Sequence, residues 1–245
     1  MRKTDRIGEV AYNNFGSKMM INKYENNKNI DVYFPEYNWT YYNVYYDKFK
    51  NGCLKCPYEP RLCGVGYLGE GQYKTKIDNV FTPQYNTWRA MITRCYGDNI
   101  NVNQTYIDCF VCDEWLNYQN FAAWYDSNYY EIYGETMNLD KDILHKGNKI
   151  YSPETCVFVP HRINSLFITC DKNRGILPIG VSKHYNKYKV TCSKYIGLYN
   201  TPEEAFEIYK EYKESIIKQV AMEYKHLIPD ILFEAMQKYE VDIND

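Results

Sequence analysis

The most informative part of the chain reads LDKDILHKGNKIYSPETCVFVPHRIN and covers residues 139–164. Short apolar runs around a polar loop predict a strand over 139–144, then a loop, a second short strand and the start of a helix. Asp140 and Asn164 bracket this unit, and both carry oxygen ligands. A hard cation such as Mg²⁺ accepts one or two such ligands, together with water and substrate phosphate. One bound metal ion can stabilise the leaving oxygen of a phosphodiester.

Helices are predicted before and after this stretch. Apolar and aromatic residues recur every three or four positions over 83–96 and again over 109–130. The strongest pattern covers 201–226, where the start Thr-Pro-Glu-Glu is typical of a capped helix. A second helix is expected over 229–239.

Strands are predicted at the two ends of the chain. The runs MMINKY (19–24), IDVYF (30–34) and NVYYDKF (43–49) are rich in β-branched and aromatic residues and are separated by polar turns. Residues 176–200 alternate apolar and polar in short pieces, which predicts a small antiparallel sheet. The fold class expected from these patterns is α+β.

Charge is distributed unevenly along the chain. The totals are 29 basic and 31 acidic residues, for a formal net charge of −2. Residues 171–200 hold six basic residues and one acidic residue, whereas 101–170 hold four and nine, and 201–245 hold five and eleven. Residues 1–100 are also basic, with 14 basic and 10 acidic residues. A polyanion would bind the two basic segments, and the acidic middle segment is where a cation site could lie.

The sequence also argues against a membrane or secreted protein. No apolar run approaches the roughly 20 residues needed to span a bilayer. The start, MRKTDRIGEVAYNN, lacks the apolar core of a secretory signal. The nine cysteines are an odd number, which favours a reducing compartment with thiols or metal ligands over a disulfide framework.

Two Cys-x-x-Cys pairs are candidates for a structural zinc site. They are Cys53 with Cys56 and Cys109 with Cys112. Thiolates at this spacing can converge on one zinc ion. The strong form of the signature places the two pairs roughly 12–20 residues apart, and here the gap is much longer. Buried thiols that act as small hydrophobic groups are the alternative.

Several motifs, taken in order, resemble one known family. TWRAMxxRCY (87–96) and VCDEWxxYxxF (111–121) precede the elements LDKD, GN, YSPExC and Asn164 within the central stretch. This order resembles the phage HNH homing endonucleases, which are ββα-metal nucleases often fused to a plant-type AP2 DNA-binding domain. The later runs GV, KYKV and LYNTPEEAFxxY (198–209) are similar to that AP2 domain, in which a three-stranded sheet enters the major groove and a helix packs on its back.

The resemblance implies three domains. A β-rich module would cover 1–80, similar to the small β modules that precede such nucleases. An HNH-like ββα-metal domain would cover 81–170. An AP2-like domain with C-terminal helices would cover 171–245. A phage protein of this kind is expected to act on double-stranded DNA in the host cytoplasm, without contact with a membrane.

The resemblance also assigns roles within the central stretch. Asp140 matches the first metal ligand, Asn164 the late ligand on the helix, and Asn148 the residue that braces the loop. The expected metal is Mg²⁺ or Mn²⁺. Cysteines of the family pattern fall at Cys95, Cys112 and Cys156, and together with Cys109 they are expected to form either a packed thiol cluster or a structural Zn²⁺ site.

The general base is the point at which the sequence departs from the family pattern. The residue after the first ligand is a histidine in the active HNH form, and here it is Lys141. A lysine must have its pKa depressed by several units to act as a base near neutral pH. His145 and His161 lie nearby in the sequence and could replace it.

Two functions follow, and they differ in class. A nuclease would use these residues and would hold DNA through the basic C-terminal sheet. A catalytically inactive, nuclease-derived binding protein would instead act as a regulator, or would inhibit a host or phage protein by presenting its acidic segments to a basic groove. The candidate DNA contacts are Arg174, Lys183, His184, Asn186, Lys187, Lys189 and Lys194.

Overall fold

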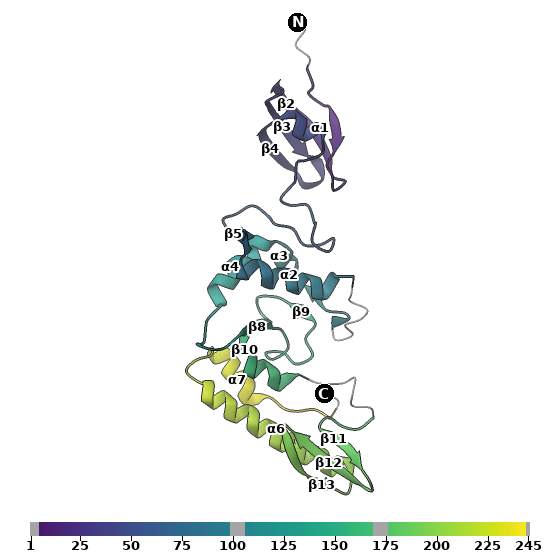
Figure 1. Ribbon diagram of the computed structural model, residues 1–245, viewed down its shortest axis with the longest axis vertical. Helices are drawn as coiled ribbons and strands as arrows, with labels where there is room; N and C mark the ends of the chain where they lie inside the picture. The colour runs from purple at the N-terminus through teal and green to yellow at the C-terminus, as the bar shows by residue number, and fades with distance from the viewer. Residues whose placement is uncertain (1–4, 99–105, 169–175, 244–245) are drawn as a thin grey trace. The chain divides into compact units, whose positions relative to one another are not determined.

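The computed structural model describes residues 5–98, 106–168 and 176–243 and has a mixed α+β fold (Figure 1). This confirms the predicted fold class. The chain divides into two compact units. The first comprises Met1–Ser127 and Ile150–Ser152, and the second comprises Asn128–Lys149 and Pro153–Asp245. The division into HNH-like and AP2-like domains stays a prediction.

The first unit begins with a four-stranded antiparallel sheet in sequential order (Figure 1). Its strands are β1 (Val10–Tyr12), β2 (Lys18–Asn26), β3 (Asn29–Phe34) and β4 (Trp39–Val44), with the short helix η1 (Pro35–Tyr37) between β3 and β4. Alternate residues such as Met19, Ile21 and Val32 are fully buried and form its core. The predicted strands over 19–24 and 30–34 are confirmed.

The third predicted strand, over 43–49, is wrong for most of its length. Only its first two residues belong to β4, and Tyr46–Lys50 form helix α1. Tyr46 and Phe49 are both buried, and a spacing of three residues places them on one side of a helix. Burial of that pair against the sheet overrides the strand propensity of the aromatic run.

The remainder of the first unit is built around α2. Its other elements are β5 (Lys76–Ile77), β6 (Val80–Phe81), α2 (Pro83–Tyr96), β7 (Phe110–Val111), α3 (Asp113–Leu116), α4 (Tyr118–Asn128) and β9 (Ile150–Tyr151). The predicted helix over 83–96 is confirmed. Thr82 caps it by accepting a hydrogen bond from the Tyr85 backbone N–H at 3.3 Å, and Trp88, Met91 and Ile92 form its buried face.

The single pattern over 109–130 is in fact divided between β7, α3 and α4. Tyr67 causes the break between the two helices, because its backbone N–H donates to Leu116 O and its carbonyl accepts from the Tyr118 N–H, each at 2.9 Å. Asn117 between them is therefore extended. This pairing joins residues about fifty positions apart, and local periodicity carries no sign of it.

The second unit starts with the predicted strand–loop–strand–helix order. β8 (Met137–Asp140) pairs antiparallel with β10 (Val157–Pro160), and α5 (His161–Asn164) and the short helix η3 (Ser165–Phe167) follow directly. The first strand is shifted relative to the prediction, because it ends at Asp140 and the following residues form the loop.

The second unit ends with the predicted sheet and helices. They are β11 (Val181–His184), β12 (Lys187–Cys192), β13 (Lys194–Tyr199), α6 (Pro202–Tyr224) and α7 (Asp230–Lys238). Thr201 accepts the Glu204 backbone N–H at 3.1 Å, and the Glu204 carboxylate reaches back to the Asn200 N–H at 3.1 Å. This reciprocal cap confirms the predicted helix start.

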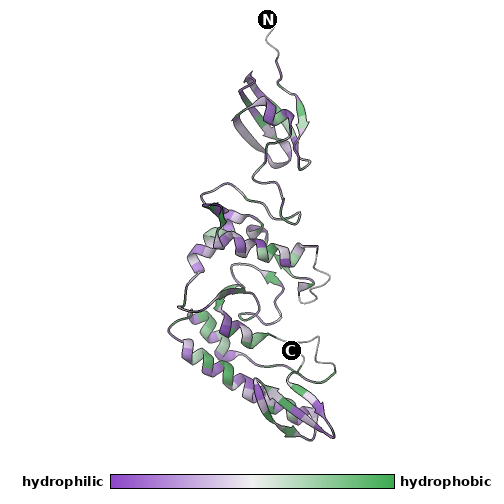
Figure 2. Ribbon diagram, viewed as in Figure 1, coloured by the Kyte–Doolittle hydropathy of each residue, from purple (hydrophilic) through white to green (hydrophobic). Residues whose placement is uncertain are grey.

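Helix α6 contributes to two hydrophobic cores within the second unit. Ala205 and Tyr209 in its first half pack with the sheet residues Val181 and Val190. Residues in its second half, such as Ile217, pack with β10, α5 and α7. Figure 2 shows hydrophobic and hydrophilic residues alternating along α6, as expected for a helix with one buried face. The strand–loop–strand–helix unit and the three-stranded sheet are therefore attached to the same helix.

Candidate metal centre and nucleic-acid interface

Asp140 is the last residue of β8 and organises the loop that follows. Its Oδ1 accepts the backbone N–H groups of Asp142 and Ile143, each at 2.8 Å. Burial disfavours the charged carboxylate and raises the pKa of Asp140 above its ordinary value, although the two N–H donors act in the opposite direction. In the part of the chain that the structure describes, no hydrogen bond is made to Oδ2. Oδ2 is the atom available to a cation.

Asn164 lies on the helix that packs against this strand. It is the last residue of α5, is half-buried, and belongs to a helix in contact with both β8 and β10. The two predicted metal ligands therefore stand on adjacent elements of one compact unit. Each residue can offer one oxygen, which gives two protein ligands in total. Mg²⁺ is commonly held by one or two protein ligands together with water and substrate phosphate.

Asn138 is the second polar residue of β8, besides Asp140, and it was not among the site residues predicted from the sequence. It lies two residues before Asp140 and so faces the same side of β8. Its Nδ2 is buried and has no hydrogen-bond partner among the described residues. The signal in the sequence is the Asn-x-Asp alternation immediately before the loop.

Lys141 braces the loop. Its side chain is buried, and its Nζ donates to both carboxylate oxygens of Asp142, at 2.7 and 2.8 Å, and to Asn148 O at 2.8 Å. An ammonium group has three protons, and these contacts can engage all of them. A base needs a lone pair on the nitrogen, so the geometry argues against the predicted catalytic role of Lys141, which stays a prediction.

Asn148 closes the same loop from the other side. Its Nδ2 donates to Lys141 O at 2.9 Å, and its backbone N–H donates to His145 O at 3.0 Å. Gly147 just before it has φ 75°, a left-handed conformation that favours glycine. His145 on the loop and His161 at the start of α5 are both exposed, and either side chain can reach solvent as a base.

The cysteines predicted to form a cluster are distributed over both units. Cys95, Cys109 and Cys112 belong to the first unit and Cys156 to the second. Among the residues that the structure describes, no group of three or more His, Cys, Asp or Glu side chains could hold a metal ion. A structural zinc needs four such ligands, so the zinc site stays a prediction without support here.

The candidate DNA contacts within the three-stranded sheet lie on both of its faces, some on the outer face and some on the face toward α6. The register pairs Val181 with Val190, both buried against α6, and the residues next to them point to the opposite side. Strand β12 has a bulge between Val190 and Thr191. Up to that bulge, the side chains on the outer face are those of Ser182, His184, Lys187, Lys189 and Leu198.

Lys183 and Lys194 lie on the other face. The Lys183 Nζ lies 4.2 Å from the centre of the Tyr188 ring, and the Lys194 Nζ lies 5.3 Å from the ring of Tyr212 on α6. Both ammonium groups are thus directed toward aromatic rings on the helix side of the sheet. Arg174, another predicted contact, lies outside the described residues.

The turn between β11 and β12 presents an exposed aromatic ring. Tyr185 has φ 51°, in the left-handed region that is uncommon for a non-glycine residue, and its side chain is 87% exposed. Its ring packs edge-on against His184, with centres 4.9 Å apart. Asn186 completes the turn. Residues 176–200 contain no acidic side chain, so a polyanion would meet no like charge from this segment.

Comparisons with protein-family models, with curated proteins and with solved structures found no match to the chain. The likeness to HNH and AP2 proteins therefore depends on the motifs alone. Among the described helices, none is long and apolar enough to cross a membrane.

Proposed function

We propose that this protein is a metal-dependent DNA endonuclease of the phage HNH type, which binds duplex DNA through an AP2-like sheet and nicks or cleaves it. The observation that carries the proposal is the outer face of β11–β12–β13, with His184, Lys187 and Lys189 exposed or half-exposed and no acidic residue in the segment. A two- or three-stranded sheet of this kind fits the major groove of B-DNA.

The outer face suits contacts with phosphates better than it suits base reading. Lysines neutralise phosphates and position a protein without specifying sequence. Asn186 at the turn carries an amide that can form a bidentate contact with adenine. Tyr185 beside it can stack or pack against a sugar. The expected behaviour is strong, salt-dependent binding with limited sequence preference.

The candidate chemistry lies in the same unit. Asp140 Oδ2 and the Asn164 side-chain oxygen would hold Mg²⁺ or Mn²⁺. When bound, such a metal would neutralise the phosphate charge and stabilise the leaving oxygen. Asp140 fits this role, because two backbone donors fix one oxygen and burial leaves the carboxylate in need of a positive partner. The Lys141–Asp142–Asn148 contacts hold the loop in place, and the attacking water would lose its proton to His145, His161 or solvent.

A second candidate function is a catalytically inactive binding protein that acts on a host or phage protein. Two observations favour it. The ammonium of Lys141 at the position of the family's base is fully engaged in hydrogen bonds. Residues 201–245, which form α6 and α7, hold eleven acidic residues against five basic ones. Such a protein would bind a basic partner and would ignore DNA.

The salt dependence of duplex binding tests the DNA interface with a matched pair of variants. Lys187→Ala/Lys189→Ala removes two charges from the outer face, and Lys183→Ala/Lys194→Ala removes two charges from the helix side. The slope of log K against log salt is about −0.9 per neutralised phosphate. We expect the outer pair to reduce the slope by about two and the inner pair to leave it nearly unchanged. Equal effects of the two pairs would remove this face from the interface.

A further inference from the structure

The first unit contains a pocket that the proposed nuclease chemistry does not use. Its volume is about 270 Å³, and its walls include Phe15, Glu59, Arg61, Tyr67, Tyr85 and Trp88. Four of these residues are aromatic. Pockets for drug-sized ligands start near 300 Å³, so this one suits a single ring system.

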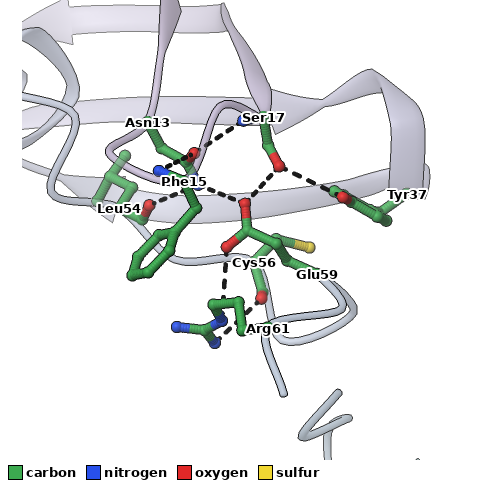
Figure 3. A network of polar contacts seen from close by, with 8 residues as sticks. All are labelled: Asn13, Phe15, Ser17, Tyr37, Leu54, Cys56, Glu59 and Arg61. Carbon is green, nitrogen blue, oxygen red and sulfur yellow. Dashed lines mark hydrogen bonds and ion pairs between the residues drawn. The ribbon is translucent and has the colours of Figure 1, made fainter. Parts of the chain in front are cut away.

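Glu59 is a buried carboxylate within this pocket, with 4% of its surface exposed. Figure 3 shows how Asn13 and Ser17 converge on it. Its Oε1 accepts the Asn13 Nδ2 at 2.8 Å and also a short hydrogen bond from the Ser17 hydroxyl. Asn13 and Ser17 are themselves buried. Oε1 is therefore fully used by the protein.

The second oxygen, Oε2, is different. It is buried and has no hydrogen-bond partner among the described residues. The nearest charge is the Arg61 Nε at 3.5 Å, an ion pair outside hydrogen-bond geometry (Figure 3). A buried carboxylate oxygen without a donor costs free energy, and a ligand that brings one donor would recover it.

The charges around the pocket restrict the ligand further. The Arg61 guanidinium lies 5.2 Å and the Lys55 Nζ lies 5.4 Å from the centre of the Phe15 ring. These two cations outnumber the single Glu59 carboxylate, so a cationic ligand would be repelled. These features fit a neutral, planar ring that carries one amino group and an anionic substituent. The ring would stack on the aromatic side chains, the amino group would donate to Glu59, and the anion would face Arg61 and Lys55.

We propose that this pocket takes one unpaired nucleobase that bears an exocyclic amino group, with cytosine as the first candidate. Its N4 amino group would donate to Glu59 Oε2, which is the contact that carboxylates make with cytosine. Its ring would lie among Phe15, Tyr67 and Tyr85, and its phosphates would face Arg61 and Lys55. Guanine offers two adjacent donors where only one acceptor is open. The inference rests on the proposed nucleic-acid partner and adds a site for single-stranded or flipped bases.

The test compares two single-stranded probes that bear an amino group or a carbonyl group at the same ring position. Fluorescein-labelled dodecamers of deoxycytidine and deoxyuridine are titrated with the full chain, and anisotropy is recorded. The basic sheet would hold both backbones equally, so the ratio of the two affinities isolates the pocket. We expect the cytidine probe to bind about tenfold more tightly, in keeping with a hydrogen bond to a charged acceptor.

Glu59→Gln sharpens this test. The glutamine oxygen can still accept from Asn13 and Ser17, and its amide nitrogen then replaces the open acceptor with a donor. We expect the preference to reverse toward the uridine probe, whose O4 is an acceptor. Glu70→Gln removes the same charge from an exposed residue outside the pocket walls, and it should keep the wild-type ratio. Thermal unfolding of both variants checks that each is folded before the affinities are compared.

Three results would overturn the inference. One is equal affinity of the folded wild type for the two probes. Another is a Glu59→Gln variant that weakens both probes alike, which would make Glu59 a structural residue only. The third is tighter binding of a fluorescein-labelled lysine-rich peptide than of either oligonucleotide, with this advantage lost in Glu59→Gln and kept in Glu70→Gln. Duplex binding through the sheet is measured separately, so the pocket and the proposed function can fail independently.

Discussion

Glu59 is a buried carboxylate and Asp140 is a half-buried one, and the two differ in what surrounds them. Asp140 is held by two backbone N–H groups of its own loop. Glu59 is held by Asn13 and Ser17, two side chains from the turn between β1 and β2, and it lies beside Arg61. In both residues one oxygen is fixed by the protein and the other is left without a hydrogen bond within the described chain. The hydrogen bonds of Glu59 join distant segments of the first unit, whereas those of Asp140 hold only its own loop, so we expect loss of Glu59 to cost more stability.

The largest expected loss of stability follows removal of Glu59. Glu59→Ala would remove the acceptor that Asn13 and Ser17 share and the buried ion-pair partner of Arg61. The weaker contacts of these side chains with Leu54 O, the Tyr37 hydroxyl and Cys56 O would remain. Removal of one member of a buried ion pair typically costs about 3–5 kcal/mol. We expect the first unit to unfold at a clearly lower denaturant concentration, as followed by tryptophan fluorescence. An unchanged midpoint would mean that the network adds little to stability.

A smaller effect is expected at Lys141. Lys141→Met keeps the apolar stem but removes the buried ammonium group that donates to Asp142 and to Asn148 O. Loss of one partner of a buried group costs about 1–3 kcal/mol. Chemical denaturation measures this cost, and the nicking rate of the same variant reports on catalysis. Activity that survives in proportion to the folded fraction would show that Lys141 is a brace, whereas complete loss from a folded variant would restore it as a base.

The smallest effect expected is a pH dependence at Asp140. Burial raises its pKa in the folded state above the ordinary value. A carboxyl group with a raised folded pKa contributes stability below its unfolded pKa, and that contribution is lost as the pH rises through the folded pKa. Asp140→Asn keeps the acceptor for the two backbone N–H groups and removes the titration. We expect the variant to flatten the fall in melting temperature between acidic and neutral pH, and an identical pH profile would contradict this.

The sequence predicts those elements that have local signals. Helices α2 and α6 begin where Thr82 and Thr201 cap them, because the cap bonds involve neighbours only. The break between α3 and α4 could not be predicted, since it depends on backbone pairing with Tyr67. Helix α1 was missed because an aromatic run favours a strand, whereas here Tyr46 and Phe49 are buried in the core of the four-stranded sheet on one side of a helix.

The candidate sites also differ in whether their residues are close together in the sequence or come from distant segments. Asp140 and Asn164 could be named as candidate ligands because they lie within one short stretch, and their role as ligands stays a prediction. The pocket at Glu59 was missed, since Phe15, Glu59 and Tyr85 come from three distant segments. The two faces of the sheet were partly predictable, because Lys187 and Lys189 alternate along one strand. The face of the sheet on which Lys183 and Lys194 lie depends on the strand register and on aromatic rings of β12 and α6, which the local sequence does not indicate.

Nicking of supercoiled plasmid by the wild type and by Asp140→Asn, with Mg²⁺ or Mn²⁺, tests the central claim most directly. The wild type should convert supercoiled DNA to the nicked or linear form only when the metal is present. Asp140→Asn should lose at least about a hundredfold in rate, as expected for loss of a group that stabilises the transition state, while duplex binding is retained and the unfolding midpoint at neutral pH is not lowered. No nicking by folded wild type with either metal, or full activity of Asp140→Asn, would contradict the account.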